Sequence, residues 1–151
     1  MSKKMLFIFN PRSGKGSIKN RLMDILDIFV KGGYEVTVHP TQCYMDGLKV
    51  TRKKAANYDI VVASGGDGTL DEIVTGMMLG GYTNPIGYIP SGSTNDFANS
   101  FHISKNMLQA ATDIVEDCLT PLMWDDLMTI ILFISQHSDC LRMCLMKRIR
   151  I

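Results

Sequence analysis

The chain carries the glycine-rich stretch Ser64-Gly65-Gly66-Asp67-Gly68-Thr69 directly behind the apolar run Ile60-Val61-Val62-Ala63. The apolar run predicts a buried parallel strand, and a following helix is predicted by the spacing of Leu70, Ile73, Val74, Met77 and Met78. A turn built mainly of glycine, between the end of a strand and the start of a helix, exposes backbone N–H groups beside the positive helix end. This geometry binds phosphate, and Asp67 would place one carboxylate where the magnesium ion of a nucleotide lies.

Predicted strands and helices alternate along the chain on both sides of this stretch. We predict strands over residues 5–9, 34–39, 60–63 and 85–89. Helical spacing and glycine stop signals predict a short helix near 96 and longer helices over 17–31, 46–57, 70–79 and 106–117. This order predicts an α/β fold, a parallel sheet with helices on both faces, in which ligands bind beyond the carboxyl ends of the strands.

Length and composition indicate one ordinary globular domain. The chain has 151 residues, of which 46% are hydrophobic and 21% charged, and its formal net charge is +1. That charge excludes a strong overall attraction to nucleic acid. The start of the chain does not have the pattern of a signal peptide, and the longest apolar stretch, 128–134, is too short to cross a bilayer. Four cysteines without metal-type spacing fit a reduced, cytoplasmic setting.

Two further loop motifs follow predicted strands, at the same edge of the predicted sheet. The first predicted strand is followed by Asn10-Pro11-Arg12-Ser13-Gly14-Lys15-Gly16. We interpret this loop as a phosphate cradle with Arg12 or Lys15 as counter-charge, or else as a plain flexible turn. The fourth predicted strand is followed by Pro90-Ser91-Gly92-Ser93-Thr94-Asn95-Asp96-Phe97-Ala98. Thr94, Asn95 and Asp96 are all suitable as a helix N-cap, and the hydroxyl and amide groups of the motif equally suit contacts with phosphates or a substrate hydroxyl.

In their order and spacing, these three motifs resemble the catalytic domain of diacylglycerol kinases and their bacterial lipid-kinase relatives. The resemblance covers about residues 4–118 and is carried by residues 10–14, 65–72 and 90–98. The element Gly65-Gly66-Asp67-Gly68-Thr69 is shared with NAD kinases and, loosely, with phosphofructokinases. The stretch Asn95-Asp96-Phe97-Ala98 is the part that favours lipid kinases.

The resemblance implies a phosphotransferase of lipid metabolism, which moves the γ-phosphoryl group of ATP to the hydroxyl of a lipid such as diacylglycerol at a membrane surface. It implies Mg²⁺ beside ATP, with Asp67 as the catalytic and metal-binding carboxylate. Thr41, which by itself would be interpreted as a loop hydroxyl, matches a nucleotide contact of the family. The full set of implied ATP-site residues is Asn10, Pro11, Arg12, Ser13, Gly14, Thr41, Gly65, Gly66, Asp67, Gly68, Thr69, Leu70, Asp71, Glu72 and Thr94.

The composition changes after about Cys118. Residues 119–151 contain no glycine, and they include the single tryptophan of the chain. In the neighbouring reading frame, Met123-Trp124-Asp125 forces Val-Gly, and the codons from Leu122 onward permit Asp-Val-Gly-Arg-Phe-Asn-Asp-His-Tyr-Phe. That peptide is similar to the start of the second lobe of the family. We therefore predict a nucleotide-binding domain over 1–118 and an aberrant, frame-shifted tail over 119–151, with a genuine short protein as the alternative.

The resemblance then implies a truncated lipid kinase with weak or no activity, because the acceptor-orienting base of the family lies in the second lobe. A domain without that lobe would expose apolar surface, so self-association as a homo-oligomer is a further expectation. The lipid acceptor implies transient peripheral contact with a membrane, and no nucleic-acid partner is expected. Two alternatives stay open, namely an NAD kinase-like small-molecule kinase and a non-catalytic nucleotide-binding module.

Overall fold

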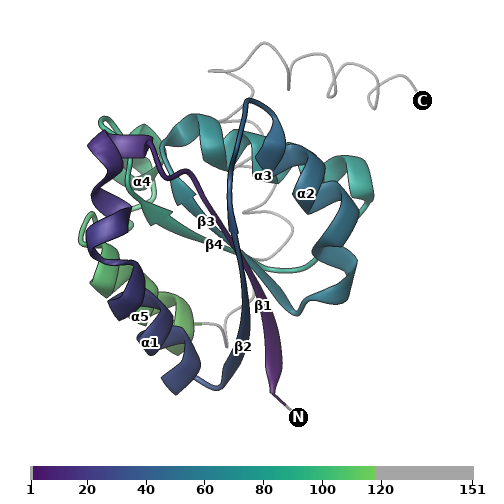
Figure 1. The fold of residues 1–151 in the computed structure, drawn as a ribbon, viewed down its shortest axis with the longest axis horizontal. Coiled ribbons are helices and arrows are strands. Elements are labelled where there is room, and N and C mark those ends of the chain that lie inside the picture. Colours follow the sequence, from purple (N-terminus) through teal and green to yellow (C-terminus); the bar gives the residue numbers. More distant parts are fainter. Residues whose placement is uncertain (1, 118–151) are drawn as a thin grey trace. The chain divides into compact units, whose positions relative to one another are not determined.

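The structure is a computed structural model and describes residues 2–117. The described residues form one sheet of four parallel strands, in the order β2-β1-β3-β4 (Figure 1). The strands are β1 Lys3–Phe9, β2 Tyr34–Pro40, β3 Ile60–Gly65 and β4 Ile86–Pro90. The predicted α/β fold is confirmed, because every strand pairing in this sheet is parallel and helices connect the strands.

Helices cover both faces of the sheet. On one face α1, Leu22–Lys31, packs against α5, Met107–Asp117, and on the other α2, Asp46–Lys54, packs against α3, Asp67–Gly80 (Figure 1). Shorter helical segments are the 3-10 segments η1, Ser13–Asn20, and η2, Ala55–Asn57, and the one-turn helix α4, Asp96–Ser100. No helix among residues 2–117 has the length and apolar character that a membrane span requires.

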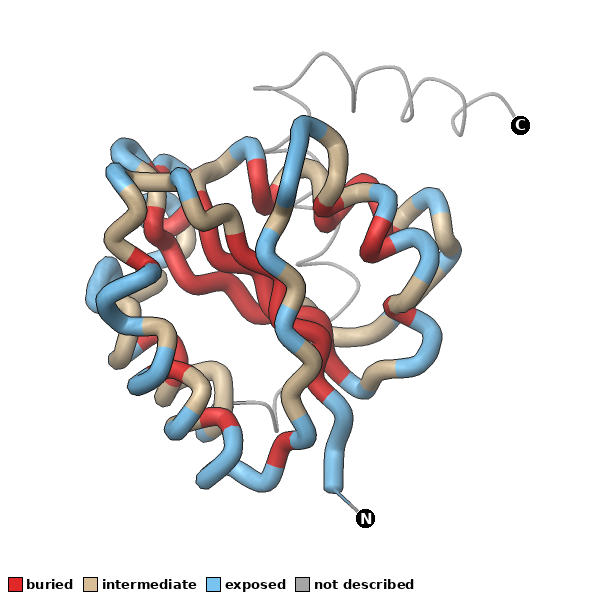
Figure 2. Tube along the Cα trace, in the orientation of Figure 1, coloured by how far each residue is buried: buried red, intermediate tan, exposed pale blue. Residues whose placement is uncertain are grey.

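The core is centred on β1, in which every residue from Met5 to Phe9 is buried (Figure 2). A continuous buried run, without alternation, is typical of a parallel strand covered on both faces. On one face, Phe7 packs edge-on against Phe29 of α1, with ring centroids 5.5 Å apart. Burial of one such side chain contributes roughly 1.5–3 kcal/mol, which makes the sheet a firm base for the loops at its ends.

The predicted helix over 17–31 is divided in the structure. Gly14, Lys15 and Gly16 all have left-handed backbone angles, with φ values of 52°, 60° and 76°. This left-handed turn lies before Ser17. Residues 17–20 then form the 3-10 end of η1, Arg21 is a turn with φ −115°, and α1 begins only at Leu22. Ile18 is nevertheless fully buried, so the apolar spacing was predicted correctly, although the α-helix begins at Leu22 and not at Ser17. The predicted tail over 119–151 lies outside the described residues.

Candidate functional site

The register of the sheet places the ends of the strands side by side. Phe9 at the end of β1 is paired with Pro40 of β2 on one side and with Ser64 of β3 on the other. Gly65 is in turn paired with Pro90 of β4. All four loops that carry candidate residues therefore leave the sheet at one edge, where the strands end. The chain goes from β1 to α1 on one face of the sheet and from the neighbouring β3 to α3 on the other face. Ligands of open α/β sheets bind at this position.

Backbone hydrogen bonds extend this alignment into the loops themselves. Asn10 N donates to Ser64 O over 2.9 Å, and Thr41 N donates to Phe9 O over 2.9 Å. Ser91 N donates to Gly65 O, also over 2.9 Å. The loops after β1, β3 and β4 thus converge, as the sequence predicts, and the Thr41 loop lies beside the first of them.

Glycines let the converging loops touch through their backbones. A Cβ on Gly14 would lie 2.1 Å from the carbonyl oxygen of Ser91, and a Cβ on Gly92 would lie 2.5 Å from Gly66 Cα. Real Cβ atoms do not approach other atoms so closely, so a side chain at either position would push the loops apart. The Cβ position of Gly66 lies 3.7 Å from Ser13 Oγ, which brings the first loop into the same contact.

The first turn of α3 provides donors for an anion. Among residues 2–117, the N–H groups of Gly66, Asp67 and Gly68 have no hydrogen-bond acceptor. Gly68 is exposed, and nothing lies within 4 Å of the place where its Cβ would be. Free N–H groups at the positive end of a helix of 14 residues suit a phosphate group.

Two residues of the same turn lie under the loop. Leu70 is 2% exposed, and Thr69 is 8% exposed, with its side chain packed against Gly65. Their N–H groups both donate to Gly66 O, over 3.1 Å for Thr69 and 3.2 Å for Leu70. The structure therefore gives these two residues a role in shaping the turn.

Asp67 reaches from the start of α3 to the start of α4. Its Oδ2 accepts a hydrogen bond of 3.0 Å from Asp96 N, and its Oδ1 accepts one of 3.2 Å from Phe97 N. The sequence suggests Thr94, Asn95 or Asp96 as the cap of this helix. Asn95 instead has a left-handed backbone, and its side chain exchanges two hydrogen bonds with Gly92. A carboxylate 29 residues away in sequence caps α4 in their place, a contact that no local signal could predict.

Two aromatic side chains, those of Tyr88 and Phe97, lie near Asp67. Tyr88 of β4 is 5% exposed and donates a hydrogen bond of 3.0 Å from its hydroxyl to Gly65 O. Its ring meets that of Phe97 edge-on, with centroids 5.7 Å apart. Burial, together with the negative charge of Asp67, raises the pKa of Tyr88 well above its ordinary value. The phenol therefore remains a neutral hydrogen-bond donor.

Glu72, one and a half turns further along α3, reaches to the opposite side. Its Oε1 accepts a hydrogen bond of 2.9 Å from Met45 N, and its Oε2 accepts one of 3.1 Å from Gly47 N. Thr41, half-buried, begins the loop that ends at these two donors. Asp71, between Asp67 and Glu72, is also half-buried.

The same loop is held from within by Asp46. Its Oδ2 accepts a hydrogen bond of 2.8 Å from Gln42 N and lies 3.1 Å from His39 Nε2. The hydrogen bond from Gln42 N is the largest cause that lowers the pKa of Asp46, and His39 adds to it.

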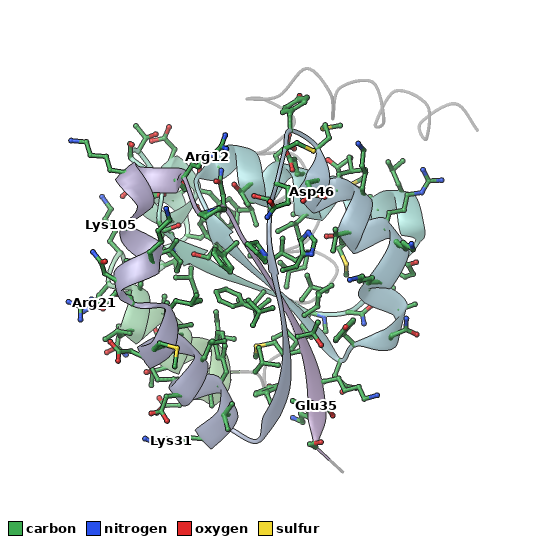
Figure 3. All side chains as sticks on the ribbon, viewed as in Figure 1. Arg12, Arg21, Lys31, Glu35, Asp46 and Lys105 are labelled. Carbon is green, nitrogen blue, oxygen red and sulfur yellow. The ribbon has the colours of Figure 1, made fainter. Side chains whose placement is uncertain are left out.

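The loop after β1 brings positive charge to the edge. Arg12 and Lys15 are exposed, while Asn10 shapes the turn by accepting hydrogen bonds from Arg12 N over 2.9 Å and from Ser13 N over 3.2 Å. In Figure 3, Arg12 and Asp46 lie at the same edge of the sheet, and Glu35 lies at the opposite one. Thr94 is exposed on the loop after β4. Among residues 2–117, no group of three or more acidic, histidine or cysteine side chains could hold a metal ion by itself.

Comparison with known proteins identifies this arrangement. The family model described as "Diacylglycerol kinase catalytic domain" matches residues 4–124. The chain belongs to this family. Diacylglycerol kinases of Staphylococcus aureus strains bovine RF122 / ET3-1 and MRSA252 are each 38% identical to it over 117 residues, which is 77% of this chain and 37% of either relative.

Solved structures of the family have the same fold. A crystal structure of a diacylglycerol kinase from Bacillus anthracis str. Sterne matches with a TM-score of 0.70 and 27% identity. The match covers 76% of this chain and 39% of that one. The chain thus spans well under half the length of the curated and solved family members it matches.

Proposed function

We propose that this chain binds ATP at the edge of the sheet where the loops converge, and that it is the nucleotide-binding part of a lipid kinase. The reaction is the transfer of the γ-phosphoryl group of ATP to a hydroxyl of a lipid such as diacylglycerol. The observation that carries the proposal is the contact of Gly66 with Gly92, because it joins two phosphate-binding turns into one surface. The family membership of residues 4–124 supports the choice of reaction.

The roles of individual residues follow from their places. The N–H groups of Gly66 and Gly68 face the phosphates, and Arg12 or Lys15 balances their charge. Asn10, Pro11, Ser13 and Gly14 form the wall next to them, while Thr41 and Thr94 contribute hydroxyls from the neighbouring loops. Gly65, Thr69, Leu70, Asp71 and Glu72 complete the proposed site by shaping the turn and supporting α3.

Asp67 is the residue proposed to meet Mg²⁺. Magnesium in nucleotide sites is held by one or two carboxylates together with phosphate oxygens, and a half-buried carboxylate beside open N–H donors fits that donor set. The ion, when bound, would neutralise charge on the transferred group. Catalysis of phosphoryl transfer depends mainly on positioning and charge neutralisation, which is what these loops are built to supply.

The proposed location is cytoplasmic, with transient contact at the surface of the membrane that holds the lipid. The test of the proposal uses the whole chain. Isothermal titration with ATP and Mg²⁺ is expected to give binding that Asp67→Ala weakens, and γ-labelled ATP offered with diacylglycerol or with NAD distinguishes the acceptor classes. Absence of ATP binding by the folded chain would overturn the proposal. Labelling of NAD alone would replace the lipid acceptor with a nucleotide.

A further inference from the structure

Helix α3 supports the proposed nucleotide site with two carboxylates that face different ways. Asp67 and Glu72 are five residues apart, which places them about 140° apart around a helix of 3.6 residues per turn. Asp67 holds the start of α4, and Glu72 holds the start of α2. From the second contact we infer that Glu72 is a positioning residue for the Thr41 loop and does not itself bind the nucleotide. This inference rests on the proposed function.

Both carboxylate oxygens of Glu72 are committed to the backbone of the Thr41 loop. They accept hydrogen bonds from Met45 N at 2.9 Å and from Gly47 N at 3.1 Å. A Cβ on Gly47 would lie only 3.0 Å from Oε2, so the carboxylate fits closely against this turn. A negative group at the start of α2 is also favoured by the helix dipole. This turn therefore uses two of the about four acceptor sites of the carboxylate, so the contacts of Glu72 support a role in holding the turn.

The Thr41 loop needs this support at its far end. Met45 has a left-handed φ of 64°, an unfavourable conformation for a residue with a side chain. The beginning of the loop is fixed by Thr41 N, which bonds to Phe9 O, and its middle by Asp46, which bonds to Gln42 N. Within residues 2–117, the carboxylate of Glu72 is the acceptor of the Met45 N–H group. Loss of this contact therefore releases the left-handed turn and, with it, the placement of the Thr41 hydroxyl.

A double-mutant cycle with Thr41 tests the inference. Glu72→Gln keeps the size of the side chain but offers an NH₂ group to one of the two N–H donors, so one hydrogen bond is lost and a repulsion replaces it. Thr41→Val removes the hydroxyl and keeps the shape. We expect Glu72→Gln to raise the Kd for ATP roughly threefold to tenfold in the wild-type background, the loss typical of one hydrogen bond. In the Thr41→Val background the same change is expected to have little effect.

The matched control is Glu35→Gln, because Glu35 is exposed on β2 at the opposite edge of the sheet. Amide hydrogen exchange, followed by NMR without nucleotide, gives a second readout. Met45 and Gly47 are expected to exchange faster in Glu72→Gln and unchanged in Glu35→Gln. If circular dichroism shows Glu72→Gln to be unfolded, Glu72→Asp, which retains the charge on a shorter side chain, takes its place.

The outcomes of these experiments distinguish the role of Glu72 from the proposed binding of ATP. Non-additive losses at Glu72 and Thr41, with faster exchange at Met45, support the inference. Additive losses mean that Glu72 contacts the nucleotide directly, and an unchanged Kd means that it does not position the loop for ATP; either result overturns the inference alone. A folded wild-type chain that binds no ATP overturns the proposed function, and the inference with it.

Discussion

Gly92 lies so close to Gly66 that a Cβ added to it would be 2.5 Å from Gly66 Cα and 2.8 Å from Asn95 Oδ1. Gly92 N also donates a hydrogen bond of 3.2 Å to Gly65 O. The turns after β3 and β4 therefore form one unit with a shared backbone surface. Glycine is required at this position by packing, before any ligand is considered.

Gly92→Ala is expected to force these two turns apart. The added methyl group meets the backbone of Gly66, which must shift, so the free energy of unfolding should fall by about 1–3 kcal/mol. ATP affinity should fall as well, because the donors of the two turns no longer face one point. Chemical denaturation and isothermal titration measure the two effects. Unchanged stability would mean that the turns separate easily and that their contact does not define the site.

Gly68→Ala is expected to weaken ATP binding without lowering stability. Nothing lies within 4 Å of its Cβ position, and alanine is favoured over glycine in a helix by up to about 1 kcal/mol, so the melting temperature should stay the same or rise. If phosphate lies against this turn, the methyl group occupies its place, and the Kd for ATP should rise at least about tenfold, equivalent to about 1.4 kcal/mol. Equal ATP affinity in a stable variant would place the phosphates elsewhere.

The fold was predictable because its signals are local. Apolar runs marked the buried strands β1 and β3, and glycines marked the turn before α3. The helix over 17–31 was predicted wrongly at its start, because Ile18 has the correct spacing for the buried face although it follows a left-handed turn. Lys15 adopts φ 60° there, and no property of lysine indicates such a conformation.

The candidate site was predictable as a set of loops but not as a set of contacts. The parallel order of the strands implies that the loop motifs meet, and the structure confirms that they do. The partners of Asp67 and Glu72 lie 25–30 residues away in sequence, so their hydrogen bonds depend on the tertiary arrangement alone. The assignment of individual residues to ATP or Mg²⁺ stays a prediction.

Asp67→Asn should separate the structural role of Asp67 from its proposed metal role. The amide keeps one acceptor but turns an NH₂ group toward the second N–H of α4, so stability should fall by about 0.5–2 kcal/mol, the range of a lost helix cap. The loss of charge should also reduce the gain in ATP affinity that Mg²⁺ provides. Titrations with and without Mg²⁺ measure this difference, and Asp24→Asn, on the exposed face of α1, is the matched control.

An equal effect of Mg²⁺ on the wild type and on Asp67→Asn would show that this carboxylate only caps α4. The stability loss would then remain without any change in metal dependence. The two roles are thus distinguished by one pair of titrations.

The pH dependence of stability is expected to report on Asp46. Its pKa in the folded protein is lowered from 3.8, mainly by the hydrogen bond from Gln42 N. A lowered folded pKa means that the unfolded chain binds the proton more readily. The stabilising contribution is therefore complete above the unfolded value and is lost as the pH falls through the folded value.

Asp46→Asn removes this contribution. The difference in unfolding free energy between the two proteins should hence shrink as the pH falls below 3.8 toward the lower folded value. Thermal unfolding across that range measures it, with Asp24→Asn as the exposed-carboxylate control. A difference that is constant with pH would mean that the contacts of Asp46 with Gln42 and His39 do not depend on its charge, and that the middle of the Thr41 loop is held by shape alone.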